Sequence, residues 1–358
     1  MSYLAQCFAS PPFSQLQLQK EPGFLQELTQ LTQWHDKVCP QYHSIVNALG
    51  YRELSFSSVA EVPFLPSGVF RSLRLSSAST GEYERTLTSS GTTGNAAVQV
   101  SLDRETAAVQ QRALAHIAGD FLGSQRLPLL ILDSPAVLSG KNRSTAKAAG
   151  ILGFSIFGRG RTFALKEDMT LDVEAVERFL EKSGDKPFLL FGFTFVVWQY
   201  FYRALCQLPQ RLDCSNGILI HGGGWKKLQD EAVPPQEFAE RLRQQCGLQR
   251  IYNYYGMAEQ AGSIFMQCEH GRYHASAFSE VLVRRADDFS LCGLHEPGIV
   301  QVLSLLPRSY PGHSLLTEDE GMLLGEDDCP CGRHGRSFAI TGRLPQAEIR
   351  GCSDAYAG

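Results

Sequence analysis

The segment 88–94 carries the strongest chemical signal in the chain, because it reads Thr-Ser-Ser-Gly-Thr-Thr-Gly. Hydroxyl groups and backbone N–H groups packed this closely can surround the oxygens of a phosphate. The Gly-Lys-Ser/Thr ending of a Walker loop is absent. A surface turn rich in serine and threonine is the alternative, but a turn does not require this strict order ahead of a strand. We therefore expect a phosphate-binding loop formed by Ser89, Ser90, Gly91, Thr92, Thr93 and Gly94.

A second group of candidate residues begins at the end of an expected strand, where the segment 254–259 reads Tyr-Tyr-Gly-Met-Ala-Glu. Tyr255 could stack on a purine, Gly256 would let the backbone approach a ligand, and Glu259 could hold Mg²⁺ between phosphates. Further along the chain, Asp319 could accept hydrogen bonds from a ribose, and Arg343 could donate them to a ribose or a phosphate. Taken singly, each of these residues fits a strand end or a solvated surface charge better than a site.

Three cysteines and a histidine are spaced as zinc ligands. Cys268 and His274 flank a short expected hairpin, and Cys329 and Cys331 belong to a tight turn. Three sulfurs and one nitrogen would complete a tetrahedral zinc site that holds a small β subdomain together. His270 could replace His274, and a plain turn remains the alternative for the Cys-Pro-Cys-Gly segment.

Strand and helix patterns alternate through the middle of the chain. Strands are expected at 129–132, 188–191, 217–221 and 251–255, and helices at 171–182, 194–206 and 235–246. This alternation predicts a largely parallel sheet covered by helices. The first residues read as helical, with a break at Pro22-Gly23, and short alternating segments after Gly271 predict antiparallel strands. We expect an α/β fold with an N-terminal helical segment (1–60), an α/β domain (61–265) and a smaller β-rich subdomain (266–358).

Composition excludes several classes of protein. The chain has 358 residues, of which 43% are hydrophobic and 20% charged, and this balance excludes wholesale disorder. Its net charge of -4 argues against a general nucleic-acid binder. The longest apolar stretch, 188–198, is shorter than a membrane span, and no secretory signal is visible in the first thirty residues. We therefore expect a cytoplasmic protein whose ten cysteines are reduced.

The order of these motifs resembles the adenylate-forming superfamily of acyl and aryl ligases, and most closely the acyl-protein synthetase (LuxE) family of bacterial luciferase operons. Besides the motifs above, the resemblance rests on Pro-Arg-Ser-Tyr-Pro-Gly-His at 307–313, Leu-Thr-Glu-Asp at 316–319, Gly-Arg at 342–343 and Ala-Glu-Ile-Arg-Gly-Cys-Ser-Asp at 347–354. It runs from Val62 to the C-terminus. It implies a large adenylating domain, completed at its nucleotide site by the smaller subdomain. The implied reaction is ATP-dependent activation of a fatty or aryl acid to an acyl-adenylate, followed by acyl transfer to a thiol.

The resemblance also implies roles for individual residues. Ser89, Ser90, Thr92 and Thr93 would contact the ATP phosphates, and Glu259 would hold Mg²⁺. The adenine and acyl pockets would be bordered by His221, Gly222, Gly223, Tyr255 and Gly256, and the ribose would be held by Asp319 and Arg343. For His221 and its glycines, a structurally satisfied histidine beside a glycine-rich loop remains the alternative.

Three departures from the superfamily pattern affect this interpretation. Ala258 stands where Ser or Thr is usual, and Asn95 stands where the phosphate loop usually ends in Lys. Most members also carry a mobile domain with a catalytic lysine, and we expect this domain to be missing here, since fifteen residues follow Arg343 in this sequence. Mg²⁺ and a basic residue would then have to stabilise the charge on the phosphates, the candidates being Lys226, Lys227 and Arg350.

Cys352 is the candidate acyl acceptor. The resemblance to the acyl-protein synthetases implies that this near-terminal cysteine receives the acyl group and forms a thioester on the enzyme. Arg350 would favour the thiolate, and Gly351 and Ser353 leave the sulfur accessible. An incidental cysteine remains the alternative.

Other functions stay open at this point. Coenzyme A or a carrier protein could accept the acyl group, as in ligases that resemble the phenylacetate-activating enzymes. A degenerate, non-catalytic binding subunit would also explain the three departures. The resemblance to luciferase-operon enzymes further implies an acyl-reductase partner.

Overall fold

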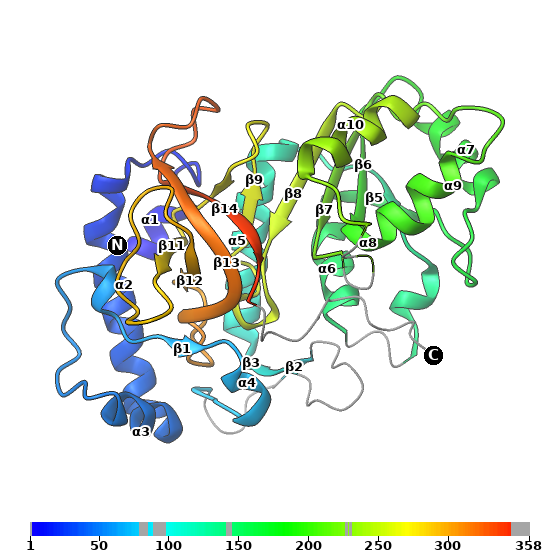
Figure 1. The fold of residues 1–358 in the computed structure, drawn as a ribbon. Coiled ribbons are helices and arrows are strands. Elements are labelled where there is room, and N and C mark those ends of the chain that lie inside the picture. The colour runs from blue at the N-terminus through cyan, green and yellow to red at the C-terminus, as the bar shows by residue number, and fades with distance from the viewer. Residues whose placement is uncertain are drawn as a thin grey trace. The chain divides into compact units, whose positions relative to one another are not determined.

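The computed structural model describes residues 2–78, 85–88, 98–140, 145–225, 228 and 231–344, with backbone alone at 85–88 and 146. These residues form two compact units (Figure 1). The second unit takes Phe121–Tyr255, and the first takes the described residues before and after it.

The first unit begins with helices that its sequence marks clearly. The longer helices are α1 (Tyr3–Cys7), α2 (Gln17–Val38), α3 (Pro40–Ala48), α4 (Val69–Ser72) and α5 (Arg104–Leu122), with short 3₁₀ turns η1 (Val59–Glu61) and η7 (Ala258–Gln260). Asp103 caps α5, because its Oδ1 accepts a hydrogen bond from the N–H of Thr106 at 2.7 Å. The break expected at Pro22-Gly23 is wrong, since α2 runs through both residues. Pro22 is the sixth residue of α2, so the helix continues past it without one of its regular backbone hydrogen bonds.

An antiparallel sheet forms the rest of the first unit. Its strands follow the order β11-β12-β13-β14-β10-β9, and β1 lies parallel to β13. The bounds are β1 (Leu65–Pro66), β9 (Phe265–Gln267), β10 (Tyr273–His274), β11 (Ser279–Arg284), β12 (Gly298–Ser304), β13 (Ser314–Glu326) and β14 (Arg336–Arg343). A separate hairpin joins β2 (Arg85–Thr88) to β3 (Gln99–Leu102).

The second unit is a parallel sheet with helices on its faces. Its strands follow the order β8-β7-β6-β4-β5, and each neighbouring pair is parallel. The strands are β4 (Leu127–Ile131), β5 (Gly158–Phe163), β6 (Phe188–Phe193), β7 (Gly217–Gly222) and β8 (Arg250–Tyr255). The helical segments are η2 (Pro135–Leu138), α6 (Ala146–Phe154), η4 (Ser155–Phe157), α7 (Val173–Ser183), α8 (Thr194–Val196), the π-helical η5 (Val197–Tyr202), α9 (Arg203–Leu205) and α10 (Pro235–Cys246).

The central strands β6 and β7 are buried along their whole length, as expected for a sheet covered on both faces. One face packs against α7, η5 and α10 in a single apolar core. On the other face, the ring of Phe154 from α6 stacks on Phe191 with centroids 4.6 Å apart. The predicted α/β fold class is therefore confirmed. Within the part of the chain described, no helix is long and apolar enough to cross a membrane.

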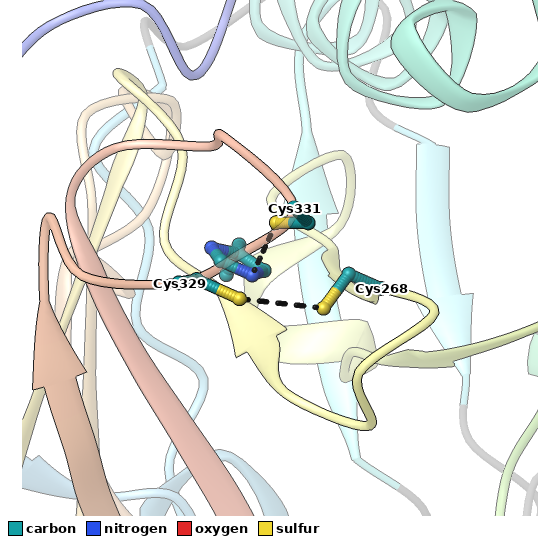
Figure 2. Close-up of side chains that lie close together, drawn as sticks. Cys268, Cys329 and Cys331 are labelled. Atoms are coloured by element: carbon teal, nitrogen blue, oxygen red, sulfur yellow. Dashed lines mark hydrogen bonds between the residues drawn. The ribbon is translucent and has the colours of Figure 1, made fainter.

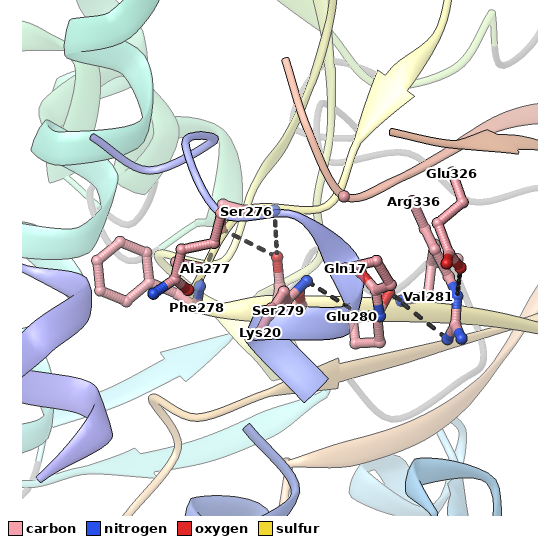
Figure 3. Close-up of polar contacts among 12 residues, drawn as sticks. Gln17, Lys20, Ser276, Ala277, Phe278, Ser279, Glu280, Val281, Glu326 and Arg336 are labelled. Carbon is pink, nitrogen blue, oxygen red and sulfur yellow. Dashed lines mark hydrogen bonds and ion pairs between the residues drawn. The ribbon is translucent and has the colours of Figure 1, made fainter. Parts of the chain in front are cut away.

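A buried ionic cluster joins α2 to strand β11. Lys20 Nζ lies 3.1 Å from Glu280 Oε2 and donates to the carbonyl of Ser279 at 2.7 Å, and both charged side chains are almost fully buried. Gln17 Nε2 donates to the same carboxylate at 2.6 Å, as Figure 3 shows. Burial alone would raise the pKa of Glu280, but the charges of Lys20 and Arg336 bring it below its ordinary value. The carboxylate therefore stays ionised and depends on its cationic neighbours.

We predict that Lys20→Met lowers the free energy of unfolding by about 3–5 kcal/mol, because it leaves a buried carboxylate without its nearest cation. Chemical denaturation at neutral pH measures this loss. Lys37→Met, at an exposed position of the same helix, is the control and should change stability by less than about 0.5 kcal/mol. The double variant Lys20→Met/Glu280→Gln should recover roughly half of the loss or more, since the stranded charge is gone. Equal stability of Lys20→Met and the wild type would contradict the assignment.

Candidate functional site

Strand β13 changes neighbours at residues 317–319. Its first residues pair with β1, Leu315 opposite Leu65 and Leu316 opposite Pro66, and from Asp319 onward it pairs with β14. On its other side, Gln301 of β12 pairs with Leu316 and Ile299 with Glu320, so residues 317–319 form a bulge. The hydroxyl of Thr317 donates to the carbonyl of Val300 at 2.8 Å and accepts the N–H of Asp319 at 3.1 Å. The bulge is therefore fixed by its own threonine, and it turns two carboxylates toward the ends of β1 and β14.

Two arginines meet these carboxylates. Asp319 lies opposite Arg343 in the sheet register, and Arg343 Nε is 3.4 Å from Asp319 Oδ1. Glu318 accepts from both arginines, with Arg71 Nη2 2.5 Å from Oε1 and Arg343 Nη2 3.3 Å from Oε2. We call Arg71, Glu318, Asp319 and Arg343 the carboxylate–arginine cluster. The structure thus brings together Asp319 and Arg343, which the sequence analysis selected, and adds Arg71 and Glu318, which it did not.

Glu259 is a buried carboxylate whose charge interacts with this cluster. It lies in the short turn η7 with 8% of its surface exposed. Burial raises the pKa of Glu259 to about 7, against the opposing positive charges of Arg71 and Arg343. A carboxyl group with this pKa is close to half ionised at neutral pH, and binding of a cation would draw out its proton. Its donor chemistry fits Mg²⁺, for which carboxylate oxygens are ordinary ligands.

The turn that carries Glu259 is anchored by its neighbour. Gln260 Nε2 donates to the carbonyl of Gly312 at 2.8 Å and to that of Val302 at 3.0 Å. Because both partners are acceptors, the amide orientation of Gln260 is fixed. Glu259 is therefore tied to β12 and to the segment 307–313, which the sequence analysis quoted only for its resemblance.

Two stacked histidines hold the segment 307–313 against the N-terminal helices. They are His35 and His313, whose ring centroids lie 4.9 Å apart. His35 Nε2 is 2.9 Å from the carbonyl of Pro307, so it carries the proton, and Nδ1 accepts from the hydroxyl of Ser77 at 2.7 Å. Thr32 gives its hydroxyl proton to the Leu28 carbonyl, so His313 Nε2 must donate to it. Burial lowers the pKa of both histidines, which keeps both rings neutral.

In the second unit, polar groups collect at the carboxyl ends of the parallel strands. His221 and Gly222 end β7, and Tyr255 ends β8. His221 Nδ1 lies 2.9 Å from the hydroxyl of Thr194, which also lies 3.2 Å from the carbonyl of Gly222. That carbonyl is an acceptor only, so the imidazole donates to the hydroxyl and the hydroxyl donates to the carbonyl. Burial lowers the pKa of His221 to about 3, and its ring is therefore neutral.

Close packing explains the glycine at the end of β7. A Cβ on Gly222 would lie 2.4 Å from the ring of Tyr254, so any side chain would displace that ring. Gly223, the next residue, has a φ of 79°, which an L-residue rarely adopts. The carboxyl edge of a parallel sheet is where ligands usually bind in this architecture. The roles of His221, Gly222, Gly223, Tyr255 and Gly256 in such binding stay predictions.

A buried ion pair lies at the same edge of the sheet. Lys147 Nζ is 2.7 Å from Asp133 Oδ2, and both side chains are almost completely buried. Ser134 donates its N–H to the other carboxylate oxygen at 2.8 Å. This pair could not be selected from the sequence, because a single lysine carries no motif.

Cys268, His274, Cys329 and Cys331 converge in the first unit, and one ligand atom from each lies within 4.8 Å of all the others. Cys268 Sγ is 3.7 Å from Cys329 Sγ, and Cys331 Sγ is 3.4 Å from His274 Nε2 (Figure 2). A tetrahedral zinc with ordinary bond lengths holds two sulfurs about 3.8 Å apart and a sulfur and a nitrogen about 3.5 Å apart. Burial lowers the pKa of His274 to about 4, so its ring is neutral, as a ligand must be. The cluster uses His274, so the alternative ligand His270 is not needed.

Several predicted residues lie outside the described residues. They are the phosphate-loop residues Ser89, Ser90, Gly91, Thr92, Thr93 and Gly94, the candidate acceptor Cys352, and the candidate cations Lys226, Lys227 and Arg350.

The family model of the LuxE acyl-protein synthetases matches residues 4–357. The chain belongs to the LuxE acyl-protein synthetase family. This membership confirms the resemblance stated from the motifs. It also confirms the interpretation of the chain as an acid–thiol ligase, an enzyme that activates a carboxylic acid and transfers its acyl group to a thiol. The long-chain-fatty-acid–luciferin-component ligase of Vibrio harveyi is 24% identical over 355 residues, which cover 92% of this chain and 88% of the relative.

Solved adenylate-forming enzymes share the fold. An open conformation of 2-hydroxyisobutyryl-CoA ligase in complex with 2-HIB-AMP and CoA has a TM-score of 0.65 at 16% identity, covering 93% of this chain and 77% of that one. The postadenylation state of the same ligase gives a TM-score of 0.62 at 15% identity, covering 90% and 67%. The chain spans less than half, 47%, of an ATP-bound RpMatB-BxBclM chimera, with a TM-score of 0.49 at 15% identity over 72% of this chain.

We predict that Glu259→Gln stabilises the protein at pH 8 and not at pH 4. The pKa of Glu259 rises from 4.5 to about 7 on folding, so above pH 4.5 the unfolded chain releases a proton that the folded chain retains. The native carboxyl therefore costs stability increasingly from pH 4.5 to 7, and this cost levels off at about 3 kcal/mol above pH 7. Chemical denaturation of the wild type and Glu259→Gln at both pH values measures the difference. A gain of the same size at pH 4, or none at pH 8, would contradict the burial of an ionisable group at this position.

Proposed function

We propose that this chain activates a long-chain fatty acid with ATP, releases pyrophosphate, and transfers the acyl group from the acyl-adenylate to its own Cys352. The family supports activation and transfer to a thiol. The similarity to the Vibrio harveyi relative, a long-chain-fatty-acid ligase, supports the substrate class.

The observation that carries this proposal is the placement of Glu259 beside the carboxylate–arginine cluster. Asp319 and Arg343 lie opposite each other across β13 and β14, and the charges of Arg71 and Arg343 act on the buried Glu259. A ribose would find an acceptor in Asp319 and a donor in Arg343. Glu259 would hold Mg²⁺, which neutralises phosphate charge when bound. The three motifs that contain Glu259, Asp319 and Arg343 would thereby have distinct and compatible tasks.

The chemistry requires no proton transfer from the enzyme in its first step. A carboxylate oxygen of the acid attacks the α-phosphorus of ATP, a new O–P bond forms, and the bond to the β-phosphate oxygen breaks. Pyrophosphate leaves with that electron pair. In the second step the thiolate of Cys352 attacks the acyl carbon, AMP leaves with the electron pair of the C–O bond, and a thioester remains.

Two alternative acceptors and one non-catalytic alternative can be separated by measuring pyrophosphate release and the mass of the chain. Coenzyme A or a carrier protein as acceptor would give a released or carrier-bound thioester and no adduct on the chain. A binding subunit would release no pyrophosphate with any acid. The burial of Glu259 at a cost in stability supports a retained catalytic role, because an unused buried carboxyl group is readily replaced. Release of the acyl group to a reductase partner and a cytoplasmic location stay predictions.

We further propose that Cys268, His274, Cys329 and Cys331 hold a structural zinc ion. Four protein ligands leave no open position, which is typical of a structural site and not of a catalytic one. Cys268 and His274 belong to the β9–β10 hairpin, whereas Cys329 and Cys331 belong to the connection between β13 and β14. The ion would therefore join two hairpins of one sheet.

We predict that the wild type, incubated with ATP, Mg²⁺ and a long-chain fatty acid, gains one acyl group by intact mass, and that hydroxylamine removes it. Cys352→Ala should lose the adduct and keep acid-dependent pyrophosphate exchange within about threefold, because the first step does not use the thiol. Cys206→Ala, which removes an exposed cysteine elsewhere, is the control and should keep both activities. Full acylation of Cys352→Ala would exclude this residue as the acceptor.

We predict that the purified wild type contains one zinc per chain by elemental analysis. Cys329→Ser should lose most of the zinc and melt at a lower temperature, since a thiolate ligand is gone. Cys292→Ser removes a buried cysteine of the same unit that lies outside the cluster and should retain the metal. Zinc at background level in the wild type, with melting unaffected by a chelator, would end this proposal.

A further inference from the structure

Arg71 reaches the carboxylate–arginine cluster through strand pairing alone. The short strand β1 lies parallel to the start of β13, and beyond it the N–H of Ser67 donates to the carbonyl of Leu316 at 2.9 Å. The chain then enters α4, whose third residue is Arg71. This route carries the guanidinium alongside the bulge, to a carboxylate 247 residues away in sequence.

The surroundings of Arg71 leave room for its guanidinium and keep donors for a ligand. A Cβ on Gly68 would lie 2.9 Å from Arg71 Nη1 and 3.5 Å from Glu318 Oε1, so the missing side chain gives this ion pair its space. Nη2 contacts Glu318, while Nε is a buried donor with no hydrogen-bond partner among the described residues. The side chain as a whole is 21% exposed. A buried donor without an acceptor usually indicates an absent ligand or water.

Two guanidinium groups, those of Arg71 and Arg343, lie beside the carboxylates of the bulge and can supply positive charge to a phosphate. Glu318 is shared by Arg71 and Arg343, each through one nitrogen. The positive charge of Arg71, like that of Arg343, also lowers the pKa of the buried Glu259. A guanidinium held by one carboxylate oxygen can still present parallel N–H groups to a phosphate, for which its planar fork is suited.

We propose that Arg71 binds the phosphates of ATP in the activation step and stabilises the charge that gathers there. This inference rests on the proposed function. It assigns to Arg71 the task of stabilising phosphate charge, for which the sequence suggested Lys226, Lys227 or Arg350. As the acid oxygen bonds to the α-phosphorus, the bond to pyrophosphate breaks and the leaving oxygens gain negative charge. Arg71 donates hydrogen bonds to those oxygens, and no proton is transferred.

The test separates the activation step from acyl transfer. Acid-dependent pyrophosphate exchange reports the first step, and acylation of the chain by a synthetic acyl-adenylate reports the second. Four variants are compared with the wild type: Arg71→Ala, Arg71→Lys, Gly68→Val and Arg285→Ala. Gly68→Val crowds the guanidinium without removing it. Arg285→Ala is the matched control, because it breaks another arginine–glutamate pair of the same unit, with Glu296 at 2.7 Å.

Arg71→Ala should lower pyrophosphate exchange about a hundredfold or more and leave acylation from the acyl-adenylate within about threefold. Arg71→Lys should restore at least about tenfold of the loss, because charge returns without the planar fork. Gly68→Val should lower exchange by about tenfold with both charges present, and Arg285→Ala should leave both assays unchanged.

Three outcomes would overturn the proposal. Full pyrophosphate exchange in Arg71→Ala would overturn this inference and leave the proposed function in place. Parallel loss of both steps in Arg71→Ala and Arg71→Lys, with lowered melting temperatures, would show that the arginine only holds the bulge in place. Absence of exchange in the wild type with every acid tested would overturn the proposed function together with this inference.

Discussion

The bulge at residues 317–319 of β13 is the constraint on which the rest of the first unit depends. A regular strand would point successive side chains to opposite faces of the sheet and would keep one neighbour on each side. Here three residues oppose Val300 alone, and β13 leaves β1 for β14 within the bulge. The two carboxylates at 318 and 319 consequently meet an arginine from each neighbouring segment. Bulges are common beside active sites because they redirect side chains in this way.

Burial of polar groups around this bulge is costly and is managed by hydrogen bonds of fixed direction. Neutral His35 and His313 fasten the segment 307–313 to helix α2, and Gln260 fastens the turn of Glu259 to the same segment. Each contact pairs a donor with an acceptor, so the network has one arrangement and not several. Glu259 is the exception, because its burial opposes its ionisation. Burial raises the pKa of this carboxyl group to about 7, and a bound cation, as proposed for this position, would favour its ionised form.

The sequence was informative where a local pattern decides the structure. Helix α10 was predicted with both of its ends, and strands β6, β7 and β8 within two residues, since apolar runs alternate with amphipathic segments there. Asp319 and Arg343 could be selected because their motifs occur in a recognisable order. Arg71 could not be selected, because no local pattern distinguishes it from other arginines. Its partner Glu318 is brought near only by the short parallel pairing of β1 with β13. The ion pair of Lys147 with Asp133 and the histidine stack escaped for the same reason, since tertiary contacts alone bring them together.

The register that joins Asp319 to Arg343 is set at the far end of the hairpin. The connection between β13 and β14 contains Cys329 and Cys331, which converge with Cys268 and His274. It is also fixed by Asp327, whose carboxylate accepts the N–H groups of Gln17 and Gly335 at 2.9 and 2.7 Å. A slip of one residue in β14 would turn Arg343 to the other face of the sheet and away from Asp319. The pairing of β13 with β14 already contains two register shifts, so such a slip should cost less free energy than in a regular pair. A zinc ion held by the cysteine–histidine cluster would therefore act on the candidate site without touching it, by fixing one end of the hairpin in which β14 pairs with β13.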